Sequence, residues 1–301
     1  MTKLRTLVVA MGMLAVSGTA MAKADKKPPA HFKCTNCKAW NAPQKPYQVY
    51  GNTWYVGTKE LSALLVTGPK GHVLLDGALP QSAPLIAANI KSLGFRMKDV
   101  KLILNSHEHF DHAGGIAALQ RASGAKVAAS AIGARVLKAG TIGRDDPQYD
   151  PSDDLSIEKV AQVSVVGDGE ILNVGDIAVK AHMTPAHSPG GTTWSWTSCE
   201  KSRCLNMVYA DSLTAVSADG YRFTSPDRSA QFAAVIDKVA ALACDIVIST
   251  HPGFTDTMEK AAAKTATINP FIDANGCRSY AAESKVRFDK RIAQERAAPL
   301  K

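Results

Sequence analysis

The most informative stretch of the sequence is Asn105-Ser106-His107-Glu108-His109-Phe110-Asp111-His112-Ala113-Gly114-Gly115. It directly follows the apolar run Val100–Leu104, which is typical of a buried strand. Where a strand runs into a loop, residues two apart point the same way, so His107 and His109 can chelate one ion. Asp111 and His112 come just after them and can face a second ion. Nitrogen and carboxylate ligands without thiolate suit zinc, and paired ions about 3.5–4 Å apart serve many hydrolases.

Two further histidines follow strand-like runs elsewhere in the chain. His187 lies in the turn-rich segment Thr184–Gly191, which comes after a predicted strand over residues 174–183. His251 directly follows the β-branched run Asp245–Thr250. Together with the motif they make six ligands, which divide into two sets of three. Each ion then keeps an open position for water or substrate, as a catalytic zinc site requires.

The first residues have the composition of a secretory signal peptide. Lys3 and Arg5 precede the apolar run 7–16, and Ala20-Met21-Ala22 supplies the small residues of a cleavage site. The apolar run is too short to cross a membrane. We therefore expect cleavage after Ala22, a periplasmic location, and no membrane attachment of the mature protein.

The six cysteines fit an exported protein, although fifteen pairings are open to six cysteines. Cys199 and Cys204 flank a short polar segment between two apolar runs, so a bridge there would staple a hairpin. Cys34 and Cys37 have Cys-x-x-Cys spacing, which could mean redox chemistry or half a zinc site. No second Cys-x-x-Cys occurs and no helix pattern begins there, so a local structural disulfide is the preferred interpretation.

The charge of the chain does not favour a nucleic-acid partner. The formal net charge of +8 falls to about +6 when Lys3 and Arg5 leave with the signal peptide. The remaining basic residues are scattered, and they form no stripe with aromatic residues. A basic solvated surface and no nucleic-acid partner are therefore predicted.

Strands, helices and ligand loops alternate loosely in both halves of the chain. Strands are predicted over residues 49–57, 62–67, 72–76, 174–183, 205–210 and 245–250. Helices are predicted from Pro80 and over residues 115–121, 131–138, 226–242 and 271–297. Mixed strands with helices outside them imply an α/β fold, an αββα sandwich with the metals at one edge. The predicted division is a signal peptide (1–22), an N-terminal extension (23–46) and one domain (47–301).

The motif and the two later histidines resemble the metallo-β-lactamase superfamily. Within it, Asp211-Ser212-Leu213-Thr214 and the placement of the cysteines resemble the third subclass of class B β-lactamases, over most of residues 47–295. The resemblance implies the same sandwich, two zinc ions per chain and a bridge between Cys244 and Cys277. The implied ligands of the two ions are His107, His109 and His187, and Asp111, His112 and His251. Where the family usually has Gly-His-Thr-Pro-Gly-Gly, residues 186–191 read Ala-His-Ser-Pro-Gly-Gly, which keeps the ligand.

The resemblance also implies an activity, the hydrolysis of the β-lactam amide of penicillins, cephalosporins and carbapenems, which would confer antibiotic resistance. A metal-bridging hydroxide would attack the amide, and Asp111 would orient it as the catalytic residue. Ser212 and Thr214 are predicted to contact the substrate, although ordinary turn hydroxyls are an equal alternative. Gln148 could line the entrance to the site. The β-lactam is the one partner expected, and the protein is predicted to be a monomer.

Two alternatives remain open at this point. In thioesterase-like and phosphodiesterase-like relatives, an aspartate near the position of Asp211 bridges the ions, and the substrate would then be a thioester or a lactone. A periplasmic protein that only sequesters metal is the non-enzymatic alternative, against which the open coordination positions argue. A serine β-lactamase is not supported, because neither Ser-x-x-Lys match is accompanied by Ser-Asp-Asn or Lys-Thr-Gly.

Overall fold

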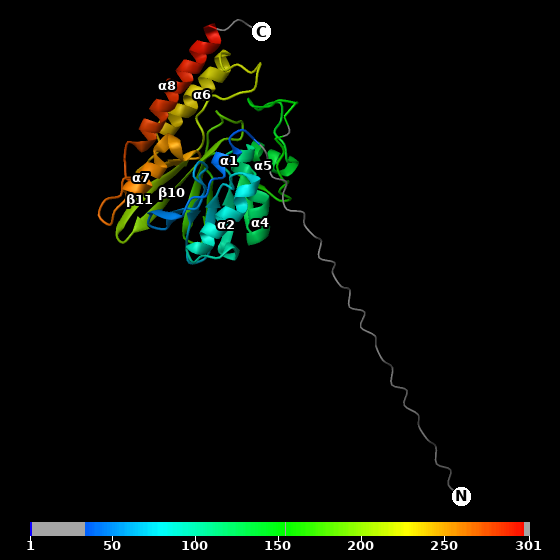
Figure 1. Cartoon of the computed structure of the whole chain (residues 1–301), viewed down its shortest axis with the longest axis vertical. Helices are drawn as coiled ribbons and strands as arrows, with labels where there is room; N and C mark the ends of the chain where they lie inside the picture. The colour runs from blue at the N-terminus through cyan, green and yellow to red at the C-terminus, as the bar shows by residue number, and fades with distance from the viewer. Residues whose placement is uncertain (2–33, 154, 298–301) are drawn as a thin grey trace. The chain divides into compact units, whose positions relative to one another are not determined.

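Two β-sheets and the helices on their outer faces make up the body of the protein after residue 33 (Figure 1). The structure is a computed structural model that describes Met1, residues 34–153 and residues 155–297. The arrangement confirms the predicted αββα sandwich. Residues 2–22 of the predicted signal peptide lie outside the described residues.

The first sheet comes from the N-terminal half of the chain. Its strands, in spatial order, are β1 (Tyr47–Tyr50), β2 (Thr53–Tyr55), β3 (Leu64–Val66), β4 (His72–Leu75), β5 (Val100–Leu104), β6 (Lys126–Ala129) and β7 (Ser164–Val165). Strands β1 to β4 pair antiparallel, and β4 to β7 pair parallel. Because β5 is parallel and lies between β4 and β6, it is hydrophobic almost throughout, as central strands are.

The second sheet comes from the C-terminal half. Its strands, in spatial order, are β12 (Ile246–Ser249), β11 (Arg203–Ala210), β10 (Thr192–Glu200), β9 (Ile177–Met183) and β8 (Ile171–Val174). Strands β12 and β11 are parallel, and the other neighbours are antiparallel. Strands β9 and β12 run in the same direction, so the loops that follow them lie at one edge of this sheet. It is the edge at which β5 of the first sheet ends.

The longer helices lie on the outer faces of the two sheets, and the short ones lie at their edges. The helices are α1 (Cys37–Trp40), α2 (Ala83–Ser92), α3 (Phe110–Ala113), α4 (Ile116–Ser123), α5 (Ala131–Ala139), α6 (Pro226–Ala240), α7 (Thr257–Ala263) and α8 (Gly276–Ala297), with 3₁₀ turns at Pro80–Ser82, Met97–Asp99 and Pro252–Thr255. Helices α2, α4 and α5 pack on the first sheet, and α6 and α8 pack on the second (Figure 1). None of the helices described is long and apolar enough to cross a membrane.

Apolar side chains fill the space between the sheets. Two of these side chains, Trp194 and Tyr209, also have polar groups that form hydrogen bonds near the ligand motif. Trp194 is fully buried, and its Nε1 donates to the carbonyl oxygen of Asn105 at 3.1 Å. Tyr209 is also buried, and its hydroxyl donates to Asp76 Oδ2 at 2.8 Å. Through these two bonds the second sheet holds the ends of β4 and β5 in place.

Three predicted boundaries are wrong. Residues 49–57 form the end of β1, a turn and β2, because Gly51 has a φ of +50° and reverses the chain with Asn52. Residues 174–183 divide in the same way between β8 and β9, where the φ of Gly175 is +59°. Helix α8 begins at Gly276 and not at residue 271, since side chains such as that of Asp273, which accepts from the Asn275 amide at 2.9 Å, favour turns there.

All three disulfides that the sequence favoured are present. They join Cys34 to Cys37, Cys199 to Cys204 and Cys244 to Cys277. The second staples the β10–β11 hairpin, as predicted, and the third ties the start of β12 to the start of α8. The Cys34–Cys37 bridge precedes Trp40, whose ring lies 5.5 Å from the ring of His251.

Candidate metal centre

The six predicted ligands meet at one edge of the sandwich. Strand β5 and the loop after it deliver His107 and His109, and the single turn α3 delivers Asp111 and His112. His187 lies in the β9–β10 loop, and His251 follows β12. Parallel strands end at a common edge, and the loops beyond their carboxyl ends are where ligand sites form in such folds. The site therefore draws on both halves of the chain.

The first donor set consists of His107, His109 and His187, whose ligand atoms lie within 4.8 Å of one another. His109 Nδ1 and His187 Nε2 are 3.2 Å apart. The three ring centroids are 4.8–4.9 Å apart, and the ring planes meet at 77–88°. Three imidazoles nearly perpendicular to one another enclose a common point, as ligands of one ion do.

The second donor set consists of Asp111, His112 and His251. Asp111 Oδ2 is 3.3 Å from the Nε2 atoms of His112 and His251, and these two nitrogens are 3.2 Å apart. The two sets adjoin, because the ring centroids of His107 and His112 are 4.3 Å apart. His251 is the most exposed member, with 22% of its side chain accessible.

The donor atoms fit zinc. With zinc-to-nitrogen distances of about 2.0–2.1 Å, the edges of a tetrahedral site measure about 3.3–3.4 Å, and the second donor set has edges of 3.2–3.3 Å. His107 Nε2 is buried without a hydrogen-bond partner among the described residues, although its other ring nitrogen is bonded. A buried nitrogen left in this state is costly unless it binds a metal.

The first donor set is held in place by one partner for each ring. The nitrogen of each ring that faces away from the site is bonded: His107 Nδ1 to Asp211 Oδ1 at 2.7 Å, His109 Nε2 to Asp146 at 3.0 Å, and His187 Nδ1 to the carbonyl of Thr214 at 2.8 Å. Acceptors at these positions fix the proton on the far nitrogen and leave the near lone pair for a metal. The ring orientations are therefore set before a metal binds.

The charges of the ligands favour a metal as well. Burial and the neighbouring histidines lower the pKa of His187 to about 3, so its ring is neutral. Although burial opposes it, His112 and His251 hold the pKa of Asp111 well below its usual range. Metal binding needs a neutral imidazole and an ionised carboxylate. Both are provided.

Comparison with known proteins places this geometry in a family. The sequence profile of the Metallo-beta-lactamase superfamily matches residues 61–198. The solved structure of Rm3 metallo-beta-lactamase is 47% identical in sequence with a TM-score of 0.85, over 88% of this chain and 99% of that chain. The chain belongs to the metallo-β-lactamase superfamily.

Further structural neighbours are metallo-β-lactamases as well. MEM-A1, a subclass B3 metallo-beta-lactamase from a soil metagenome library, is 47% identical over 86% of this chain and 99% of its own, with a TM-score of 0.83. SMB-1, solved with mercaptoacetic acid, is 43% identical over 85% of this chain and 99% of its own, with a TM-score of 0.81.

Curated proteins match a shorter part of the chain. The hydroxyacylglutathione hydrolase of Anaeromyxobacter dehalogenans is 31% identical over 140 residues, which are 46% of this chain and 43% of that protein. The chain therefore spans less than half the length of the curated relatives it matches.

Asp211 lies behind the first donor set of this superfamily member and not between the two sets. Its Oδ1 bonds the far nitrogen of His107, and its Oδ2 faces Gly191, where an added Cβ would lie 2.4 Å away. The backbone amide of Asp211 donates to Thr193 Oγ1 at 3.1 Å. This placement makes Asp211 a partner that orients His107, so the geometry gives no support to a metal-bridging role.

Glu108 ties the ligand motif to the loop that carries His187. It is 1% exposed, and its carboxylate accepts from the Gly190 amide at 2.9 Å and from Ser188 Oγ at 3.1 Å. A Cβ at Gly190 would lie 2.2 Å from Glu108 Oε2, so only glycine fits there. Burial raises the pKa of Glu108.

Replacing Glu108 by alanine should lower the free energy of unfolding by about 2–4 kcal/mol, because it leaves the buried Gly190 amide unpaired and opens a cavity. Glutamine has the same size and retains an acceptor, so Glu108→Gln should keep most of the stability. Denaturant unfolding of the metal-free protein measures both changes. Glu158→Ala is the control, since Glu158 is exposed and pairs with Arg121. Equal losses of unfolding free energy in Glu108→Ala and Glu158→Ala would contradict the structural role given to Glu108.

The three residues predicted to contact the substrate lie beside different parts of the site. The amide nitrogen of Gln148 is 3.3 Å from both His109 Nδ1 and His187 Nε2, against the first donor set. Thr214 Oγ1 lies 3.0 Å from His187 Nδ1. Ser212 is 1% exposed, and its hydroxyl lies 2.8 Å from that of Thr250, the residue before His251. The structure thus brings all three next to predicted metal ligands.

Sequence reasoning missed three buried acids around the site, Asp76, Glu108 and Asp146. Asp76 accepts from the Ser106 amide at 2.7 Å and so fixes the start of the motif. Its φ of +63° is unusual for a residue other than glycine and is the kind of local strain found at functional sites. A carboxylate directly after strand β4 was the available signal in the sequence.

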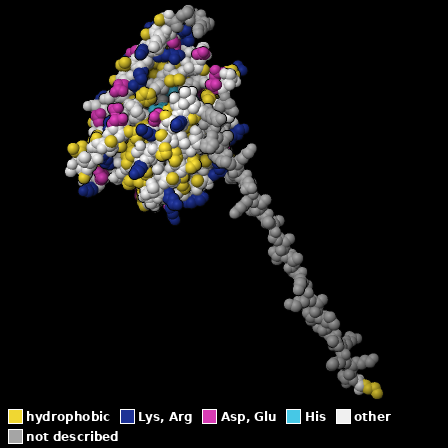
Figure 2. Space-filling model, in the orientation of Figure 1, with side chains coloured by type: hydrophobic (Ala, Val, Ile, Leu, Met, Phe, Trp, Pro, Cys, Tyr) yellow, Lys and Arg dark blue, Asp and Glu magenta, His cyan; other side chains and the backbone are white. Residues whose placement is uncertain are grey.

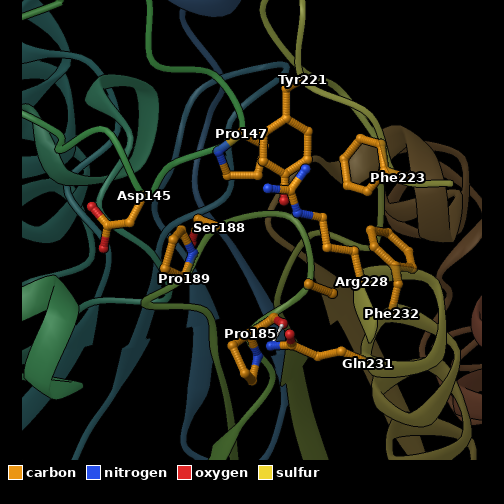
Figure 3. A pocket seen from close by; sticks show the side chains of 11 residues that line it. Asp145, Pro147, Pro185, Ser188, Pro189, Tyr221, Phe223, Arg228, Gln231 and Phe232 are labelled. Atoms are coloured by element: carbon orange, nitrogen blue, oxygen red, sulfur yellow. Dashed lines mark hydrogen bonds between the residues drawn. The ribbon is translucent and has the colours of Figure 1, made fainter. Parts of the chain in front are cut away.

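The surroundings of the site are hollowed. Figure 2 shows a small area of histidine surface recessed in the face of the molecule, with Lys and Arg scattered around it. A separate cavity of about 190 Å³ borders the loop that carries His187, and its lining includes Pro189, Tyr221 and Arg228 (Figure 3). The guanidinium of Arg228 stacks 4.3 Å from the centroid of the Tyr221 ring.

Proposed function

We propose that the protein is a periplasmic, zinc-dependent β-lactamase that hydrolyses penicillins, cephalosporins and carbapenems and thereby confers antibiotic resistance. The observation that carries the proposal is the second donor set, in which Asp111, His112 and His251 complete a site without cysteine and without Asp211. Identity of 43–47% to metallo-β-lactamases over nearly their whole length supports it.

The six predicted ligands would hold two zinc ions, His107, His109 and His187 the first and Asp111, His112 and His251 the second. Zinc in such a pair supplies a nucleophile from water at neutral pH and polarises the carbonyl oxygen of the substrate. Asp111 directs Oδ2 to its donor set, and its other oxygen is available to orient the attacking water. The buried neutral rings of His107 and His187 keep the first set rigid.

The chain's own contacts to substrate are proposed on the same geometry. Gln148 would bind the lactam from the side of the first donor set, where its amide nitrogen already lies. Ser212 would bind the substrate carboxylate beside the second set, and Thr214 would contact the substrate from beside His187 of the first set. We propose further that residues 1–22 are a cleaved signal peptide, that residues 47–301 form the catalytic domain after an extension over 23–46, and that the protein acts as a monomer.

Zinc-loaded mature protein should hydrolyse a carbapenem and a cephalosporin, and exhaustive chelation should abolish the activity until zinc is restored. The reason is that every proposed step depends on ions held by these six side chains. The loss of β-lactam absorbance measures turnover, and magnesium added in place of zinc is the control, because magnesium prefers oxygen ligands.

The same preparation distinguishes the alternatives. Turnover of lactoylglutathione or a lactone, with no turnover of either β-lactam, would replace the proposal by a thioesterase or lactonase. Tight binding of two zinc ions with no hydrolysis of any of these substrates would favour metal sequestration.

A further inference from the structure

The loop between α5 and β7 contains a buried carboxylate that the proposed chemistry does not use. The loop runs from the end of α5 at Ala139 to the start of β7 at Ser164, and long loops in compact domains usually serve a function. Its residue Asp146 is 3% exposed, whereas the adjacent Asp145 has 42% of its side chain exposed and pairs with Arg135 at 2.8 Å. An acid buried in a loop needs partners that compensate the loss of water.

The partners of Asp146 belong to two different parts of the site. Both of its carboxylate oxygens accept from the His109 ring, at 3.1 and 3.0 Å from Nε2. The same Oδ1 accepts from the backbone amide of Gln148 at 2.8 Å. One carboxylate therefore holds a metal ligand and the backbone of the loop together.

The bond from the Gln148 backbone amide to Asp146 also fixes where the Gln148 side chain begins. Its amide nitrogen lies 3.3 Å from His109 Nδ1 and 3.3 Å from His187 Nε2. The loop is otherwise fixed near this point by the Ala218 amide, which donates to the Pro147 carbonyl at 2.9 Å. Pro147 lies beside Tyr221 in Figure 3, and Asp145 lies apart from both. Asp146 thus fixes the residue from which the Gln148 side chain extends.

We propose that Asp146 is a positioning residue that orients His109 for the first metal ion and, through the Gln148 amide, sets the substrate-facing side chain of Gln148 over the same ion. Metal affinity and substrate affinity are then linked by one carboxylate. The substrate half of this inference rests on the proposed function, and the metal half does not.

Three variants separate the two tasks. Asp146→Ala removes both bonds, so zinc affinity should fall by about 10–100-fold, as for other carboxylates behind ligand histidines, and KM for a carbapenem should rise about tenfold. Asp146→Asn keeps Oδ1, which faces both the Gln148 amide and His109 Nε2, but it removes the negative charge and replaces Oδ2, the nearer acceptor of the His109 N–H, by an NH₂ group that cannot accept. Its zinc affinity should fall while KM measured at saturating zinc stays close to that of the parent. Gln148→Ala should raise KM and leave zinc affinity unchanged.

Asp145→Asn is the matched control, because it changes the neighbouring acid without touching His109 or Gln148, and it should alter neither quantity. Zinc affinity is measured by competition with a chromophoric chelator, and the electronic spectrum of the cobalt-substituted protein reports the His109 ligand field. Parent-like zinc affinity and spectrum in Asp146→Asn and Asp146→Ala would overturn the inference, as would a rise in KM for Asp146→Asn as large as for Asp146→Ala. A parent protein that binds zinc but hydrolyses no β-lactam would refute the proposed function, and the zinc measurements would still decide the role of Asp146 toward His109.

Discussion

Replacing Asp111 by asparagine should lower kcat/KM for a carbapenem by about 10³-fold or more, with the fold intact. The variant keeps the size of the side chain but loses the charge that the second donor set supplies to its ion. Its one remaining acceptor oxygen cannot both bind the ion and orient the attacking water. Asp111 Oδ2 lies 3.3 Å from both His112 Nε2 and His251 Nε2, so its carboxylate is the third member of that set.

The measurement is steady-state hydrolysis at saturating zinc, together with zinc content and a far-UV circular dichroism spectrum. Asp176→Asn is a suitable control, because Asp176 is exposed in the turn between β8 and β9, at the opposite end of β9 from the loop that carries His187. An unchanged kcat/KM in Asp111→Asn at full zinc occupancy would remove Asp111 from the catalytic role. A fall that zinc excess restores completely would limit its role to metal binding.

The ligand set could be predicted from the sequence because each ligand has a local signal. His107, His109, Asp111 and His112 fall within one short motif after an apolar run, and His251 directly follows a β-branched run. Loops at strand ends converge on one edge of a sandwich, so strand prediction alone brings these residues together. The sandwich and the packing of α2, α4, α5 and α6 were predictable from apolar periodicity for the same reason.

The partners of the ligands could not be predicted in this way. Asp146 and Asp211 reach their histidines across 37 and 104 residues, and no periodicity relates positions so far apart. From the sequence alone, Asp211 could either bridge the two ions or bind neither. The contact that decides the question, a 2.7 Å bond to the far nitrogen of His107, depends on how β11 and β5 face each other across the core.

Strand boundaries failed for a different reason. Gly51 and Gly175 each begin a tight turn inside a run that is otherwise strand-like. A glycine followed by a short polar residue is a known turn signal, and in both runs it was visible but was outweighed by the apolar residues around it. These errors did not affect the site, because the ligands lie beyond the other ends of the strands.

The affinity of the second donor set for zinc should rise about tenfold for each pH unit between pH 6 and 9. Burial lowers the pKa of His112, but Asp111 and Asp76 outweigh it and raise this pKa to about 10 in the metal-free protein. His112 is therefore protonated throughout this range and must lose one proton when the ion binds. A ligand with a pKa above the working pH costs a factor of ten in affinity for every unit between the two.

Two variants isolate the donor sets for this measurement. His187→Ala disables the first set and should show the full dependence, about 100-fold between pH 6 and 8, in competition titrations against a chelator of known pH response. His251→Ala disables the second set and reports the first set alone, in which burial lowers the pKa values of His107 and His187, while Asp146 raises that of His109 against the effect of burial. Calorimetry in buffers of different ionisation enthalpy counts the protons directly. A flat affinity for the second set, with no proton released, would mean that His112 is already neutral and that Asp76 and Asp111 do not hold a proton on it.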